Sequence, residues 1–178
     1  MVAYHDEEWG TPTHDDVELF ERLVLESFQA GLSWSTILRK REAFRSAFHG
    51  FDPAVVATFG AADRDRLMAD AGIVRNGAKI DATIGNAAAT LALASRHGSF
   101  DDYLADRLPG PVPRLPRDTV GGDIPVTTPA AEALSADLKR HGFRFVGPTI
   151  VYSFMESVGL VDDHLPGCFR YVGPDPRP

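Results

Sequence analysis

The segment DDHLPGCFRY contains the only cysteine of the chain, Cys168, four residues after His164. Both side chains are common zinc ligands, and a turn at Pro166 and Gly167 would bring them to one ion. Because tetrahedral zinc takes four ligands, others must come from elsewhere, and His5 is a candidate that would join the two ends of the chain. The pair alone is a weak signal, so a metal site and a metal-free segment both stay open.

Glu26 is a second candidate, because it falls on the apolar face of a helix predicted over residues 17–31. Leu19 and Leu23 share that face at helical spacing. A buried carboxylate must find a partner or bind a proton. The following QAGLSW segment presents Trp34, and a carboxylate beside an indole could bind a flat heteroaromatic molecule. The alternative places Glu26 at the margin of the apolar face, in water.

The stretch LKRHGFRFVGPTIVYSF predicts two helices joined by a short connection that Gly142 and Gly147 bracket. The second helix would open at Pro148 and Thr149, and the unpaired N–H groups of a helix start favour an anion such as phosphate. Arg144 adds local positive charge. These features are typical of a helix-hairpin-helix module that binds the DNA backbone without reading its sequence. An ordinary helical hairpin ended by glycine is the alternative.

Composition limits the remaining possibilities. The 178 residues carry a formal net charge of -7, which argues mildly against a partner held by bulk electrostatics, such as non-specific nucleic acid. A role on DNA therefore needs a local patch of donors. No apolar run reaches the roughly 20 residues of a membrane span, and a single cysteine fits a reducing compartment. We expect a cytoplasmic, monomeric protein that forms one domain over residues 1–178 and has no membrane partner.

Hydrophobic periodicity and capping residues predict an all-α fold. The proline-rich segment at about 108–127 interrupts the helices as an unusually long loop. The helix-hairpin-helix is expected at about 130–160. The predicted helices cover residues 17–31, 36–50, 51–60, 63–72, 77–98, 99–108, 130–142 and 148–159.

Several blocks then occur in a recognisable order: YHDEEWG, LESFQAGLSWSTILRKREAFRSAF, DAGIVRNGAKIDATIGNA and LKRHGFRFVGPTIVYSFMESVGLVDDH. Together they resemble the DNA-3-methyladenine glycosylase I family of bacterial base-excision repair enzymes, over essentially the whole chain. The match is weakest at residues 108–127. The resemblance implies a compact helix-hairpin-helix DNA glycosylase fold with its termini brought together.

The resemblance also implies an activity. The enzyme would flip 3-methyladenine out of alkylated double-stranded DNA and hydrolyse its N-glycosidic bond, without strand cleavage because no lysine nucleophile follows the hairpin. The alternative is a non-catalytic helix-hairpin-helix DNA-binding module, which would have no use for Glu26 and Trp34.

The resemblance implies roles for individual residues. Glu26 would be the carboxylate that recognises the base, with Tyr4, Trp9 and Trp34 as aromatic contacts. Leu32 would be a wedge that fills the gap left by the flipped base. The DNA-binding hairpin would comprise Gly142, Phe143, Arg144, Val146, Gly147 and Thr149.

The same resemblance implies a structural zinc clamp between the termini. His5, His164 and Cys168 match three of its four ligands. The fourth is a cysteine in a short R-C-x-W segment before the YHD block, whereas this sequence begins MVAYHDEEWG. We favour a start upstream of Met1 over loss of the ligand, and we expect weak or absent zinc in the chain as given. A metal hydrolase with an open three-ligand site is the rival interpretation of these residues.

Overall fold

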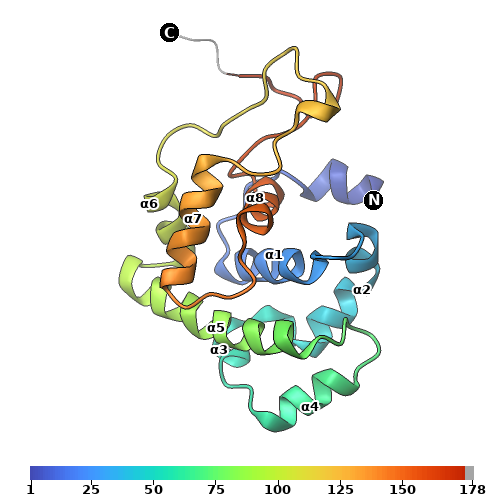
Figure 1. Cartoon of the computed structure of the whole chain (residues 1–178), viewed down its shortest axis with the longest axis vertical. Coiled ribbons are helices and arrows are strands. Elements are labelled where there is room, and N and C mark those ends of the chain that lie inside the picture. Colours follow the sequence, from blue (N-terminus) through green and yellow to red (C-terminus); the bar gives the residue numbers. More distant parts are fainter. Residues whose placement is uncertain (175–178) are drawn as a thin grey trace.

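The computed structural model describes residues 1–174, which form helices and connecting segments without a named β-strand (Figure 1). The predicted all-α class is therefore confirmed. The elements are η1 (Tyr4–Glu8), α1 (Asp16–Gln29), α2 (Trp34–Ala47), η2 (His49–Phe51), α3 (Pro53–Val56), α4 (Ala61–Ala69), α5 (Gly77–His97), α6 (Phe100–Arg107), η3 (Gly121–Asp123), α7 (Pro129–Arg140) and α8 (Pro148–Ser157).

Capping residues explain where several helices begin. The Asp15 carboxylate accepts a hydrogen bond from the Glu18 amide at the start of α1, and Thr128 does the same for the Ala131 amide at the start of α7. Ser33 precedes α2 as expected, but its hydroxyl does not cap the helix backbone. The π-helix η1 was not predicted from the sequence.

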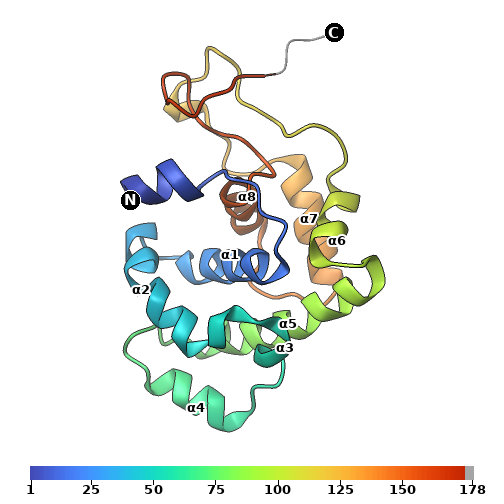
Figure 2. The same ribbon diagram turned by 180° about the vertical axis from the view of Figure 1, so that it is seen from behind.

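Helices α1 and α5 contribute to two apolar clusters, one on either side. The first cluster joins them to α6, α7 and α8, and the second joins them to α2, η2, α3 and α4 (Figures 1 and 2). Helix α1 is consequently buried along most of its length, from Leu19 to Phe28. A polar residue on this helix is thus held in a rigid environment.

The N-terminal and C-terminal segments lie in the same half of the molecule, together with the long loop (Figure 1). The Arg170 guanidinium donates to the carbonyl oxygens of His5 at 3.2 Å and Trp9 at 2.9 Å. The Tyr171 hydroxyl donates to the Leu115 carbonyl of the loop at 3.0 Å. The expected approach of the termini is confirmed. Within residues 1–174, every helix is too short or too polar to cross a bilayer.

Candidate active site

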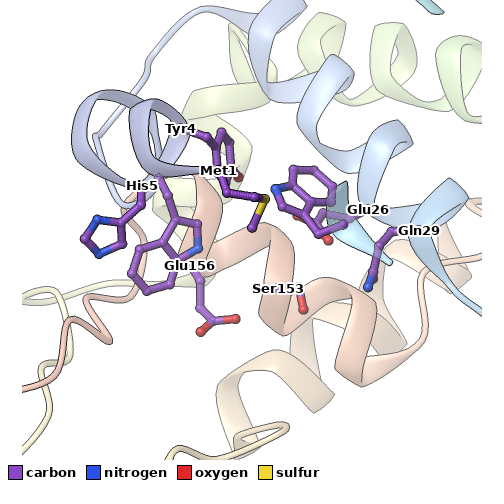
Figure 3. A pocket seen from close by; sticks show the side chains of 9 residues that line it. Met1, Tyr4, His5, Glu26, Gln29, Ser153 and Glu156 are labelled. Atoms are coloured by element: carbon purple, nitrogen blue, oxygen red, sulfur yellow. The ribbon is translucent and has the colours of Figure 1, made fainter. Parts of the chain in front are cut away.

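A cavity of about 300 Å³ opens where η1, α1, α2 and α8 converge (Figure 3). Its lining combines aromatic rings with carboxyl groups, which suits a flat molecule that also carries hydrogen-bonding edges. The lining residues are Met1, Tyr4, His5, Trp9, Glu26, Gln29, Trp34, Ser153 and Glu156.

Glu26 is buried on α1 with 6% of its surface exposed, so the interpretation that placed it in water is wrong. Burial raises the pKa of its carboxyl group from 4.5 to about 8, although the nearby Arg22 charge opposes the shift. The Arg22 guanidinium instead donates hydrogen bonds to Glu8 at 3.2 Å and Glu18 at 2.9 Å. The Glu26 carboxyl group therefore lines the cavity without an ion-pair partner among the described residues. It is available to a positively charged or hydrogen-bonding ligand.

Tyr4 and Trp34 form the aromatic wall beside this carboxyl group. Their ring centroids lie 5.3 Å apart with an angle of 51° between the planes. The Tyr4 hydroxyl and the Trp34 indole N–H are both buried, and neither has a hydrogen-bond partner of good geometry among the described residues, although the Arg22 guanidinium lies next to Tyr4, 5.6 Å from the centroid of its ring. Buried polar atoms in folded proteins are normally paired. Two unpaired groups on residues of one cavity therefore indicate a ligand that would complete their bonding.

Three further polar side chains of the cavity were missed from the sequence: Gln29 on α1, and Ser153 and Glu156 on α8. Ser153 and Glu156 project from α8 toward the cavity (Figure 3). They are three positions apart on the helix and thus share one face, which was the available signal. Burial, and then the charge of Asp163, raise the pKa of Glu156. The site consequently has a second carboxyl group besides Glu26.

The three predicted metal ligands also come together. Their ligand atoms lie within 4.8 Å of one another, and the Cys168 Sγ lies 3.5 Å from the His5 Nε2. The Nδ1 of His164 is bonded to Asp162 at 2.7 Å, so its Nε2 is left buried and without a partner among the described residues. A carboxylate behind a histidine is the usual support of a metal ligand. These residues therefore fit a metal ion.

Trp9 connects the metal cluster to the cavity. Its ring centroid is 4.7 Å from that of His164, in an edge-on arrangement, and its plane stacks on His5 at 6.0 Å. Since Trp9 also lines the cavity, displacement of the histidines would move one of the cavity's walls.

The predicted wedge residue Leu32 is 40% exposed in the turn between α1 and α2, after Gly31 with a φ of 85°. The turn is held from behind by Lys79, which is buried and was missed from the sequence. Its ammonium group donates to the carbonyl oxygens of Phe28 at 3.1 Å and Ala30 at 2.8 Å. Leu32 is therefore presented to solvent by an anchored backbone.

The predicted DNA-binding hairpin joins α7 to α8 and requires one correction. Phe143 and Val146 are buried, with 3% and 0% exposure, and Phe143 stacks on Phe100. Their side chains belong to the core, so only the hairpin backbone is available to DNA at these positions. Arg144 and Thr149 are exposed, as a contact with DNA requires.

The hairpin region offers a run of unpaired backbone donors. The N–H groups of Phe145, Val146 and Gly147 have no acceptor among the described residues. Helix α8 follows without a side-chain cap, and Pro148 occupies its first turn. Gly142 reaches a φ of 91°, which lets the chain reverse direction here. This geometry suits an anion such as a DNA phosphate.

Comparisons with known proteins agree with this geometry. The sequence profile of the methyladenine glycosylase family matches residues 1–171. DNA-3-methyladenine glycosylase 1 of Escherichia coli is 48% identical, over 98% of this chain and 93% of its own. A crystal structure of 3-methyladenine DNA glycosylase I superimposes with a TM-score of 0.91 at 46% identity, covering 96% of this chain and 93% of that one. A related glycosylase in complex with 3-methyladenine gives 0.89 at 41% identity, covering 94% and 89%. The chain therefore belongs to the methyladenine glycosylase family.

Proposed function

We propose that the protein removes 3-methyladenine from alkylated double-stranded DNA by hydrolysing the N-glycosidic bond. The observation that carries this proposal is the buried Glu26 carboxyl group in one cavity with the unpaired Tyr4 hydroxyl and Trp34 indole N–H. Family membership supports the same activity. A non-catalytic DNA-binding module would leave this constellation without a purpose.

The chemistry needs little from the protein beyond binding. Methylation at N3 makes adenine cationic on its sugar, so the base is already a good leaving group. The protein must extract the nucleotide from the stack, at a cost of a few kcal/mol, and distinguish the damaged base from adenine. An ionised Glu26 and the electron-rich face of Trp34 both favour a cation over a neutral ring.

The free cavity and the loaded cavity differ in protonation. Because burial raises the pKa of Glu26 to about 8, the empty site holds a proton at neutral pH. A bound cationic base stabilises the carboxylate and lowers that pKa, which releases the proton. The site thus exchanges a proton for the positively charged base. Water then attacks the sugar carbon, and the free base leaves.

We also propose that His5, His164 and Cys168 are ligands of a structural zinc site that holds the ion weakly, because they supply three of the four ligands that a tetrahedral site takes. Zinc would supply a tie between the N-terminal π-helix and the C-terminal segment, with no part in bond cleavage. His164 is only 3% exposed, which fits a closed structural site better than an open hydrolytic one. Stability, more than base release, should therefore respond to chelation.

The direct test measures free 3-methyladenine released from methylated duplex DNA by the purified protein. The wild type should release it, and Glu26→Gln should reduce release at least about a hundredfold, as expected when a single key electrostatic group is lost. Glu21→Gln is the matched control, because Glu21 is equally buried on α1 but pairs with Arg45. Base release by Glu26→Gln at the rate of Glu21→Gln would contradict the role of Glu26.

A further inference from the structure

The backbone of the hairpin between α7 and α8 is held by side chains from other parts of the fold. The Ser27 hydroxyl on α1 lies 2.9 Å from the carbonyl oxygen of Phe145 and 2.8 Å from that of Leu23 on its own helix, so its single proton is shared between the two acceptors. Ser135 on α7 donates to the carbonyl oxygen of Val146 at 2.6 Å. Both serines are buried, with 5% and 1% exposure. Two consecutive carbonyl groups are thus turned into the protein.

Asn86 on α5 forms two hydrogen bonds with the backbone of Arg144, the residue before Phe145. Its side-chain amide donates to the Arg144 carbonyl oxygen at 2.9 Å and accepts from the Arg144 N–H at 2.8 Å. The Arg144 guanidinium also donates to the Asp81 carbonyl oxygen at 2.8 Å. Since Asn86 is 2% exposed, water cannot easily replace these contacts. Side chains from α1, α5 and α7 therefore hold the backbone of Arg144, Phe145 and Val146 by hydrogen bonds.

This arrangement separates the backbone acceptors of the hairpin from its backbone donors. The carbonyl oxygens from Arg144 to Val146 point to buried donors, whereas the N–H groups of Phe145, Val146 and Gly147 bond to no described residue. Phe145 adopts a φ of 55°, which is unfavourable for a residue with a Cβ atom. The inward hydrogen bonds on either side of it keep the chain in this conformation.

We propose that Ser27, Asn86 and Ser135 are positioning residues that aim the hairpin N–H groups at a phosphate of the DNA backbone. This inference rests on the proposed glycosylase function. Ser27 directly follows Glu26, so one turn of α1 supports both the base cavity and the hairpin. Helix α1 consequently links the base cavity directly to the hairpin, whose backbone α5 and α7 also hold.

The test separates DNA binding from base binding. Ser27→Ala and Ser135→Ala each remove one inward hydrogen bond and leave every cavity residue in place. Ser157→Ala is the matched control, because the buried Ser157 hydroxyl bonds only to the Phe154 carbonyl of its own helix. Affinity is measured for a duplex with a tetrahydrofuran abasic site, over a range of salt concentrations, and for free 3-methyladenine.

Each of the two hairpin variants should bind the duplex about three- to tenfold more weakly, as expected for one lost hydrogen bond. The slope of log affinity against log salt should change by less than about one, since the loosened contact is made by uncharged N–H groups and not by a lysine or arginine. Affinity for free 3-methyladenine should match that of the wild type and of Ser157→Ala.

Unchanged duplex affinity in both variants would overturn the inference. So would an equal loss of duplex and free-base affinity, or a loss in Ser157→Ala of the same size, because either points to general structural damage. The proposed function is judged separately from the wild type. If the wild type neither binds nor releases 3-methyladenine, the function itself is wrong. If it does both while Ser27→Ala and Ser135→Ala both keep full duplex affinity, only the positioning role is wrong.

Discussion

Replacing Glu26 by glutamine should stabilise the fold while it removes base recognition. The folded protein raises the pKa of Glu26 from 4.5 to about 8, because burial penalises the carboxylate. The folded state therefore binds a proton more tightly than the unfolded state. Its stability is complete below about pH 4.5 and is progressively lost as the pH rises toward about 8. Glutamine has nearly the same shape and never ionises.

The size of the effect follows from the pKa difference. Each pH unit between the two pKa values costs the folded wild type about 1.4 kcal/mol. At pH 7, about 2.5 units above the ordinary pKa, Glu26→Gln should be more stable than the wild type by about 3 kcal/mol. The difference should vanish near pH 4.5 and level off above about pH 8.

Urea unfolding of both proteins at pH 5, 6, 7 and 8 measures this difference directly. Glu42→Gln serves as the control, since the Glu42 side chain is 80% exposed on α2 and its pairing with Arg45 is a surface interaction. If the unfolding free energies of the wild type and Glu26→Gln run parallel from pH 5 to 8, the reasoning is refuted. Parallel curves would mean that ionised Glu26 does not destabilise the folded protein. A stabilised but fully active Glu26→Gln would instead refute the link between burial and recognition.

Further outcomes are expected elsewhere in the molecule. Trp34→Leu should weaken binding of free 3-methyladenine in calorimetry by about 1–3 kcal/mol, the usual contribution of base stacking. Leu32→Ala should slow base release from duplex DNA but leave the melting temperature unchanged, since Leu32 is partly exposed. Asp137→Asn should lower stability at pH 7 by about 2 kcal/mol in urea unfolding. Hydrogen bonds from arginine and tyrosine side chains outweigh burial and lower the pKa of Asp137 to about 2. The contribution of Asp137 to stability is therefore present above about pH 4 and lost in stronger acid. Zinc should raise the melting temperature of the wild type by several degrees but not that of Cys168→Ser; equal melting curves with and without zinc would argue against the metal site.

Much of the fold could be predicted because local signals agree with the final packing. Asp15, Asp52 and Thr128 cap the helices that follow them, and Glu26 interrupts an apolar face that proves to be buried. Such features depend on neighbours within a few residues along the chain. Periodicity was therefore sufficient to locate the helix that carries Glu26.

The remaining features depend on contacts between distant segments. The resemblance identified the hairpin block but not which side chains turn inward, so Phe143 was assigned to DNA although it stacks on Phe100. Glu156 was overlooked because only the packing of α8 against α1 shows that its face borders the cavity.

The Arg170 side chain joins the C-terminal segment to the N-terminal segment by hydrogen bonds that do not involve a metal ion. Besides the two carbonyl groups of the π-helix region, its guanidinium donates to the Thr11 hydroxyl at 3.0 Å. If the three ligands hold zinc, the Arg170 contacts would keep the first residues in place when the metal is removed. Closure of the molecule would then not depend on the metal alone.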